Sequence, residues 1–333
     1  MKKKMVLLLS FLSVFMLVAC KNSSELVKTD YFEIDEATKK GKEYMQEISK
    51  EGENSIGSYS LQRVAENSNN VILNYKVSKL RGIDVDVDEL DIKVIDGEEG
   101  YKVKDVNAKN LIQVYLDGEN LRIKQEDTGS SDLLIRKKDL PSDVYPKKDY
   151  IILNKISIEV GDYDKLAIDL KGKRVGIVNK SNKGYLISLA EVENASQTIG
   201  SNDSTGGTDN NGSSVDPSTL EEIMEKPIAS NLVPYDLIEA KSIEKVSFSA
   251  DGSFFIVQIN NGNSSSLKIY KNPSGELLDM DLDKIFSPEK YTLNINTIND
   301  EGLFVKVSAI GNDKEEEGLY KLDLKAMKIL NVD

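Results

Sequence analysis

Val246-Ser-Phe-Ser-Ala-Asp-Gly-Ser-Phe-Phe-Ile-Val-Gln258 is the stretch that decides the fold of this chain. Apolar and polar residues alternate before Asp251-Gly252, and a mostly apolar run follows it. An Asp-Gly pair supplies the positive φ that a tight hairpin needs, so the stretch predicts two antiparallel strands joined by a short turn. A related stretch, 293–307, begins about fifty residues later and keeps Asp300 and Gly302, which indicates an internal repeat.

The two-residue period extends over most of the chain after Asn54. Turn pairs such as Asp96-Gly97, Asp117-Gly118 and Lys171-Gly172 separate the apolar runs. The expected strands of the first part are 71–77, 83–87, 90–95, 101–106, 111–116, 121–125, 133–136, 151–160, 166–170, 174–179 and 185–189. Many short strands joined by hairpins predict a mainly β fold of antiparallel, hairpin-rich domains with few short helices.

One amphipathic helix is expected over 35–50, before the strands begin. Ile34, Ala37, Met45 and Ile48 recur at helical spacing, although Gly41 lowers the helix propensity. The apolar stripe is expected to dock onto the sheet that follows.

Each repeat unit contains a strand, an Asp/Gly turn, a second strand, a long polar turn, a third strand and a weaker fourth strand. This unit is similar to a blade of the WD40-like or TolB-like propellers, whose inner hairpin carries Phe-Ser-Pro-Asp-Gly where this chain has Phe248-Ser249-Ala250-Asp251-Gly252. Ala250 departs from the usual Pro. The resemblance implies a partial or complete β-propeller with Phe248 and Phe255 packed between sheets. Two units are too few to close a propeller, so either the N-terminal strands supply further blades or the units are ordinary β-meanders.

The first twenty residues have the pattern of an exported protein. Lys2, Lys3 and Lys4 precede an apolar run that is too short to span a bilayer, which is typical of a signal peptide. Leu17-Val18-Ala19-Cys20 resembles the lipobox of bacterial lipoproteins, in which Leu17 and Ala19 are read by the signal peptidase. The resemblance implies that Cys20 carries a diacylglycerol thioether whose acyl chains, such as palmitate, hold the protein on the membrane. The alternative is an ordinary signal sequence that ends in a buried cysteine.

Five segments follow from these patterns: a signal peptide (1–19), a lipidated Cys20 with its tether (20–33), an N-terminal mostly β domain with a leading helix (34–193), a flexible Ser/Gly/Asn linker (194–218) and a C-terminal β domain with two blade-like repeats (219–333). The linker is expected because its composition cannot bury enough apolar surface to offset ordering. A short helix is expected where the second β domain begins, at Asp216-Pro217.

The residue inventory excludes several kinds of chemistry. The chain has no histidine and one cysteine, which removes Ser-His-Asp and Cys-His catalysis and His-ligated zinc. No phosphate-cradling glycine motif is present. A formal net charge of −13 disfavours nucleic acid as a partner. The sequence therefore predicts no cofactor and no enzyme activity.

Asp84, Asp86 and Asp88 begin like a calcium loop and are weak candidates for a metal site. Glu89 occupies the position that requires Gly, and Ile95 the position that requires a bidentate Glu. The alternating valines are expected to face the core, which would leave the three carboxylates on one solvent-exposed face of a strand.

The sequence predicts an extracytoplasmic protein that is held on the cell membrane by its lipid and acts as a non-catalytic binding module. The alternatives are an assembly or accessory factor of a cell-envelope complex and a carboxylate-dependent envelope hydrolase. The partners expected are the membrane, through the anchor, and a protein or wall-polymer ligand, but not nucleic acid. The composition, rich in Lys, Asn and Ile, together with the lipobox resembles that of low-GC Gram-positive proteins.

Overall fold

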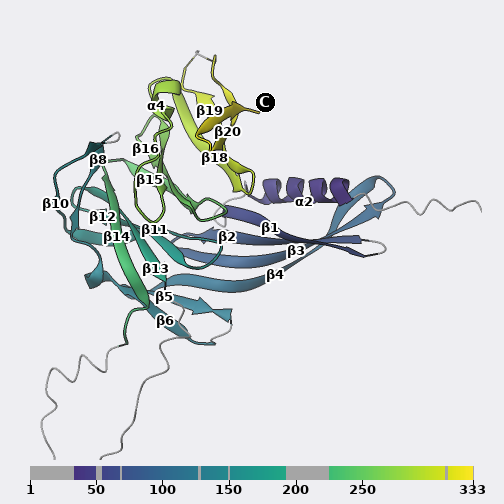
Figure 1. The fold of residues 1–333 in the computed structure, drawn as a ribbon, viewed down its shortest axis with the longest axis horizontal. Helices are drawn as coiled ribbons and strands as arrows, with labels where there is room; N and C mark the ends of the chain where they lie inside the picture. The colour runs from purple at the N-terminus through teal and green to yellow at the C-terminus, as the bar shows by residue number, and fades with distance from the viewer. Residues whose placement is uncertain are drawn as a thin grey trace, which may run out of the picture.

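Antiparallel strands form most of the chain in a computed structural model (Figure 1). The structure describes residues 34–49, 55–67, 70–126, 129–148, 151–192, 225–311 and 314–332. The predicted signal peptide and tether, with Leu17, Ala19 and Cys20, lie outside these residues. So do the linker and the short helix at 216–226, apart from the last two positions of that helix. The mainly β, antiparallel fold class that the sequence predicted is confirmed.

The first sheet has six strands in sequential order. They are β1 (Ile56–Asn67), β2 (Asn70–Arg81), β3 (Asp84–Gly97), β4 (Gly100–Asp117), β5 (Asn120–Gln125) and β6 (Ser131–Arg136). Two of these strands each replace a predicted pair of strands, because residues 88–89 of β3 and 107–110 of β4, which were expected to separate strands, pair regularly in one continuous ladder. The irregularities of this ladder are two register shifts, at Lys104 and Leu111 of β4. The sequence did not predict β1.

Helix α2 (Ile34–Ile48) lies on the first sheet (Figure 1). Ala37 and Met45 are buried against apolar residues of β2 and β3, which confirms the predicted docking of the apolar stripe. A Cβ at Gly41 would collide with the side chain of Leu73. Gly41 therefore allows the helix to approach the sheet closely, and this outweighs its low helix propensity.

The second sheet has four strands, and its last two are far apart in the sequence. They are β11 (Val160–Ile168), β12 (Arg174–Ser181), β13 (Gly184–Val192) and β14 (Ala229–Ile238). Leu186 of β13 pairs with Leu237 of β14, so one sheet contains strands from both sides of the predicted linker.

Short elements connect the first and second sheets. They are a 3₁₀ helix (Lys137–Asp139), β7 (Asp143–Val144), β8 (Lys147–Lys148), β9 (Ile151–Ile152) and β10 (Ile156–Ser157). The prediction of a single strand over 151–160 is wrong. The chain changes partner there, because β9 pairs with β8, β10 pairs with β7, and Val160 begins β11.

The two predicted repeat units form the third and fourth sheets. The third contains β15 (Ser242–Phe248), β16 (Phe254–Asn260) and β17 (Ser265–Lys271), and the fourth contains β18 (Tyr291–Asn299), β19 (Gly302–Ala309), β20 (Gly318–Asp323) and β21 (Lys328–Asn331), with helix α4 (Leu282–Ile285) between the two sheets. Gly252 has a φ of +75°, as the predicted hairpin requires. The fourth strand of the first unit is reduced to one bridge between Tyr270 and Leu277.

Three apolar clusters join the sheets in chain order. The first lies between the first and second sheets, the next between the second and third, and the last between the third and fourth. Phe248 and Phe255 lie in the second of these clusters with ring centroids 5.0 Å apart, as predicted. The first strands of the sheets also meet, because β11 contacts β15 and β1 contacts both β15 and β18.

The fourth sheet meets the first sheet and α2 through polar contacts, which are called the seam below. Asp300 accepts a hydrogen bond from the backbone amide of Leu61 at 2.8 Å, and Asn299 donates to the Tyr59 hydroxyl at 3.3 Å. Lys42 of α2 pairs with Glu301 at 2.7 Å. Within the described ranges, no helix is long and apolar enough to cross a membrane.

Candidate binding site at the converging turns

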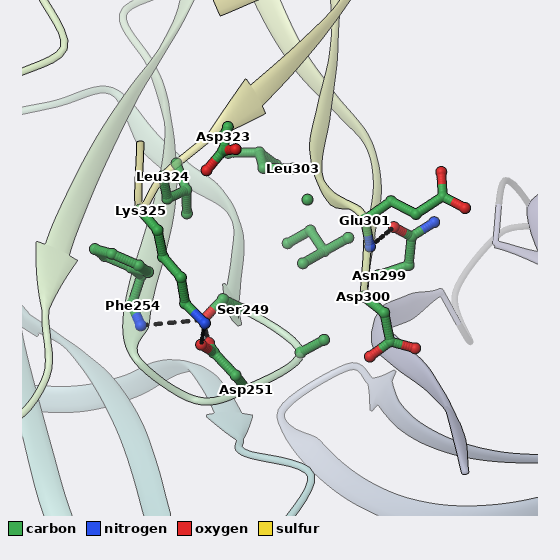
Figure 2. A pocket seen from close by; sticks show the side chains of 13 residues that line it. Ser249, Asp251, Phe254, Asn299, Asp300, Glu301, Leu303, Asp323, Leu324 and Lys325 are labelled. Atoms are coloured by element: carbon green, nitrogen blue, oxygen red, sulfur yellow. Dashed lines mark hydrogen bonds and ion pairs between the residues drawn. The ribbon is translucent and has the colours of Figure 1, made fainter. Parts of the chain in front are cut away.

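The two repeated turns that the sequence singled out come together in space. The β15–β16 turn, the β18–β19 turn and the turn after β20 line a pocket of about 140 Å³. Figure 2 shows Lys325 beside Asp251 on one wall and Asp300 and Glu301 on the other. The repeat thus predicted two of the three segments of the pocket, and the third comes from the end of the chain.

Asp251 organises the first turn. Its carboxylate accepts hydrogen bonds from Ser249 Oγ at 2.7 Å, from the Ser253 amide at 3.0 Å and from Ser253 Oγ at 2.9 Å. Lys325 Nζ lies 2.8 Å from Asp251 Oδ2, the oxygen that also accepts from Ser253 Oγ. Burial by itself would raise the pKa of Asp251, but the hydrogen bonds from Lys325, Ser249 and Ser253 outweigh it and hold the pKa well below its usual range.

The remaining carboxylates of the pocket also make hydrogen bonds or ion pairs with the protein. Asp300 and Glu301 make the seam contacts with Leu61 and Lys42. Asp323 accepts a hydrogen bond from the Ala326 amide at 3.0 Å. These three carboxylates are therefore in contact with groups of the protein itself.

The carboxylates with raised pKa values lie elsewhere. Burial raises the pKa of Asp169, which nevertheless accepts hydrogen bonds from the amides of Lys173 and Arg174 at 2.7 and 3.1 Å. Burial also raises the pKa of Asp86. Neither residue lines the pocket.

The predicted exposure of the acidic row on β3 is wrong. Asp86 and Asp88 are only 1% and 3% exposed. Asp86 faces Arg81 Nε at 2.8 Å, and Asp88 accepts hydrogen bonds from Lys79 Nζ at 2.6 Å and Asn110 Nδ2 at 2.8 Å. β3 is an inner strand whose two faces are both covered, so alternation does not separate a buried face from an exposed one.

The partners of this row are cations and amides rather than further metal ligands. Asp84 accepts a hydrogen bond from the Leu116 amide at 3.3 Å. Among the described residues, no three acidic or thiol side chains are placed to hold a metal ion.

A buried ionic cluster that sequence reasoning missed lies between β14, β17 and β8. Asp236 is fully buried, and its Oδ2 accepts hydrogen bonds from Lys268 Nζ and the Tyr270 hydroxyl, both at 2.8 Å. Its Oδ1 accepts from the amides of Lys147 and Leu237 at 2.7 and 2.8 Å. An acidic residue in the otherwise apolar run Tyr235-Asp236-Leu237-Ile238 was the available signal, because such a residue is buried only when it is paired.

Lys147 lies over two aromatic rings of the same cluster. Its Nζ is 5.8 Å from the centroid of Tyr235 and 5.6 Å from that of Tyr270, and it donates a hydrogen bond to the Gly275 carbonyl. Burial lowers the pKa of Lys147. The cluster joins three segments and contains no free nucleophile or base.

Comparison with known proteins finds no matching family model and no matching curated protein. Three solved structures illustrate the distant similarities that are found. The β-propeller domain of the trilobed protease from Pyrococcus furiosus matches with a TM-score of 0.27 and 10% identity over 80% of this chain and 64% of that one. TolB from Acinetobacter baumannii matches with a TM-score of 0.27 and 10% identity over 78% and 67%. Hsv2 from Kluyveromyces lactis matches with a TM-score of 0.24 and 12% identity over 81% and 94%.

This chain therefore spans less than two thirds of the length of the trilobed-protease domain that it matches. TM-scores at this level do not assign the chain to any of these families.

Proposed function

We propose that the protein is a lipoprotein anchored through Cys20 on the extracytoplasmic face of the membrane, where it acts as a non-catalytic binding module. The anchor is supported by the lipobox-like sequence Leu17-Val18-Ala19-Cys20. We further infer a partial propeller, because stacked antiparallel sheets whose first strands meet have the arrangement of propeller blades.

The observation that supports a non-catalytic role is that the carboxylates in the pocket are already bound by other groups of the protein. Asp251, Asp300 and Glu301 all bind groups of the protein itself, and the pKa of Asp251 is lowered rather than raised. The chain has no histidine, and the other reactive groups of the pocket, Ser249 and Lys325, both bind Asp251, whose hydrogen bond also raises the pKa of Lys325. Their arrangement favours a surface that binds over one that transfers protons.

A binding experiment tests this role. The purified protein is immobilised and incubated with an extract of membrane and cell envelope, and the retained material is analysed by mass spectrometry. Retention of one defined ligand with unchanged mass is expected. A shortened ligand would indicate the alternative of a carboxylate-dependent hydrolase, and Asp251→Asn would then show whether this pocket is responsible. Retention of nothing would contradict the binding role.

A second experiment tests the anchor. A Cys20→Ser variant has no thiol to carry lipid, so it is expected in the medium or as an unprocessed precursor. Cell fractionation and mass measurement distinguish these states from the wild-type membrane form. A variant that stays on the membrane and is cleaved normally would contradict the proposal.

The alternative of an assembly or accessory factor is favoured by one feature, the two-stranded ribbon of β8 and β9. Ile151 and Ile152 are 67% and 66% exposed, and Tyr145 and Leu153 beside them are 52% and 43% exposed. Clustered exposed apolar side chains are typical of protein contact sites. An Ile151→Asp/Ile152→Asp variant in the same retention experiment would lose a protein partner that binds there, while a ligand bound elsewhere would be retained.

A further inference from the structure

The third sheet ends in a strand whose outer edge is only partly paired. β17 pairs with β16 along its whole length, but on its other side it makes one bridge, between Tyr270 and Leu277. The first, second and fourth sheets each have at least four strands. The third sheet therefore lacks most of a fourth strand, and the edge of β17 between Ser265 and Ile269 has no strand beside it among the described residues.

The chain turns away from β17 soon after this bridge. The Leu278 amide still donates to the Ile269 carbonyl, at 2.7 Å. Asp281 then has a left-handed φ of +52°, and helix α4 begins at Leu282. A left-handed residue cannot continue an extended strand. The segment that would complete the fourth strand is thus directed away from the edge.

A cavity of about 290 Å³ lies where the fourth strand would continue. Three consecutive residues of β17, Leu267 to Ile269, line one side of it, and the departing segment lines the other, with Met280 and Leu282 among its residues. Consecutive side chains of a strand point to opposite faces, so a cavity that three of them border lies along the edge of the strand. This cavity is called the edge slot below.

The hydrogen bonds of β17 show which of its backbone groups face the edge slot. The amides of Ser265 and Lys271 donate away from β16, at 2.9 and 2.8 Å. The amide and carbonyl of a residue in an antiparallel strand point to the same side, and this side alternates along the strand. The amide and carbonyl of Leu267, midway between these two residues, therefore also point away from β16 and toward the slot.

The backbone of Leu267 is unpaired on this side. Neither its amide nor its carbonyl bonds to any backbone or side-chain group in the part of the chain that the structure describes. Native proteins pair nearly all backbone groups that are withdrawn from water, and Leu267 is only 7% exposed. One residue of an added antiparallel strand would satisfy both groups at once, because such a pair exchanges two hydrogen bonds.

The side chains around the edge slot are apolar. Leu267 and Ile269 belong to the apolar cluster shared with the fourth sheet, and so do Met280 and Leu282 across the slot. A residue that pairs with Leu267 would point its side chain to the same face as Leu267 does. An apolar side chain at that position would therefore lie against this cluster, while its two neighbours in the added strand would point to the other face.

We propose that the edge slot binds an extended segment of a partner protein, which adds to β17 as a fourth strand and places an apolar side chain opposite Leu267. Main-chain hydrogen bonds supply affinity in this mode of recognition, and the pockets for alternate side chains supply specificity. Two carboxylates and one ammonium border the slot, from Asp281, Asp283 and Lys284, which favours a neutral or basic segment over an acidic one. The proposal rests on the binding role proposed above and gives it a partner class.

Fluorescence anisotropy of labelled peptides, titrated with the purified full chain, tests the proposal. The probes are heptapeptides of threonine with a C-terminal lysine and one central apolar residue, which is valine, leucine, isoleucine, methionine or phenylalanine in turn. At least one of them is expected to bind, and the same peptide with a central aspartate at least about tenfold more weakly. A copy of the tightest binder that is N-methylated at its central residue has no amide to donate to Leu267, so it should also lose about tenfold or more.

Hydrogen exchange on the unaltered protein locates the bound peptide. In the free protein, the Leu267 amide is expected to exchange much faster than the Lys268 amide, which faces β16. The tightest peptide should slow exchange at Leu267 by about tenfold or more and leave the amides of the first sheet unchanged. A Leu267 amide that is already protected in the free protein would overturn the proposal. Protection that rises with protein concentration would assign the edge to a second copy of the chain and would also overturn it.

A variant of the slot and a matched control complete the test. Met280→Gln places a polar amide in the apolar wall of the slot and is expected to weaken peptide binding by about tenfold. Met327→Gln, the same change at a position that is 50% exposed, should bind as the wild type does. Thermal midpoints show whether both variants fold. If Met280→Gln does not fold, the N-methylated peptide and hydrogen exchange still decide the question.

The binding data can contradict the proposal in three ways. None of the apolar peptides binds, the N-methylated peptide binds as tightly as its parent, or the aspartate peptide binds as tightly as the apolar ones. If an envelope extract still supplies one retained ligand in any of these cases, the general binding role stands, and only the edge slot and its partner class are wrong.

Discussion

The carboxylate of Asp300 accepts a hydrogen bond from the backbone amide of Leu61 at 2.8 Å, and so joins the last sheet of the chain to the first. The two residues are 239 positions apart. The contact occupies an amide on β1 that has no further strand beside it, because β1 is an edge of the first sheet. At this edge the Asp300 side chain thus supplies the hydrogen-bond acceptor that a neighbouring strand supplies elsewhere in the sheet.

Replacing Asp300 by Ala is expected to loosen the seam without unfolding the protein. The lost hydrogen bond is solvent-exposed, so the expected decrease in the free energy of unfolding is about 1 kcal/mol or less. Hydrogen exchange of the Leu61 amide should accelerate, while amides of the second sheet keep their protection. An unchanged exchange rate at Leu61 would show that the contact is not maintained in solution.

Replacing Asp236 by Asn is expected to destabilise the protein by about 3 to 5 kcal/mol, because Lys268 would keep a charge beside a fully buried group that no longer neutralises it. Urea denaturation measures the change. Glu276→Gln is the matched control. Its ion pair with Lys271 is long, at 3.6 Å, and exposed, so a change below about 0.5 kcal/mol is expected. Equal effects of the two changes would contradict the importance of the buried cluster.

Lys245 gives the stability a specific dependence on pH. Burial lowers the pKa of Lys245 to about 8, whereas the unfolded chain has a lysine pKa of about 10.4. Between these values the unfolded state binds more protons, so this residue makes the stability rise with pH from about 8 to 10. In a Lys245→Met variant this rise should be absent. Denaturation of both proteins across that pH range measures the difference, and parallel curves would contradict the assignment.

Replacing Gly41 by Ala tests the close approach of α2 to the first sheet. Alanine favours helix by up to about 1 kcal/mol, but its Cβ would overlap Leu73, and overpacking of this kind typically costs about 1 to 3 kcal/mol. A net loss of stability is therefore expected. Gly311→Ala, where a Cβ meets no atom within 4 Å, is the control and should change stability by less than about 0.5 kcal/mol. Stabilisation by Gly41→Ala would contradict the packing.

Residue patterns in a short stretch predicted those elements that depend only on the residues of that stretch. Asp251-Gly252 identified the hairpin correctly because a short turn, here residues 249–253, depends on its own residues. Alternation along β3 located the strand, but the burial of Asp86 depends on what covers both faces of the sheet, which lies elsewhere in the chain. β14 was missed because Pro234 interrupts its pattern, and its partner β13 precedes the linker.

In the candidate sites, too, the sequence predicted the features set by nearby residues and missed those that depend on distant segments. The repeat predicted the turns that line the pocket, but not that Lys325 from the end of the chain would pair with Asp251. The proximity of Thr297, Lys306 and Gln46 could not be predicted from the sequence, because Thr297 and Lys306 share a face only through the register of β18 and β19, and Gln46 joins them from α2. Register is set by the whole sheet, and a single sequence does not give it.

Apolar clusters bind each sheet to the next, whereas the seam between the last sheet and the first consists of hydrogen bonds and one exposed ion pair. Water can replace such contacts at a small net cost, while parting an apolar interface exposes hydrocarbon. We therefore expect the seam to open at a lower cost in free energy than the apolar interfaces do. Asp300 and Glu301 of the seam line the pocket at the converging turns. A hinge-like opening at the seam would thus widen this pocket, and a ligand that bridges its two walls would hold the molecule closed.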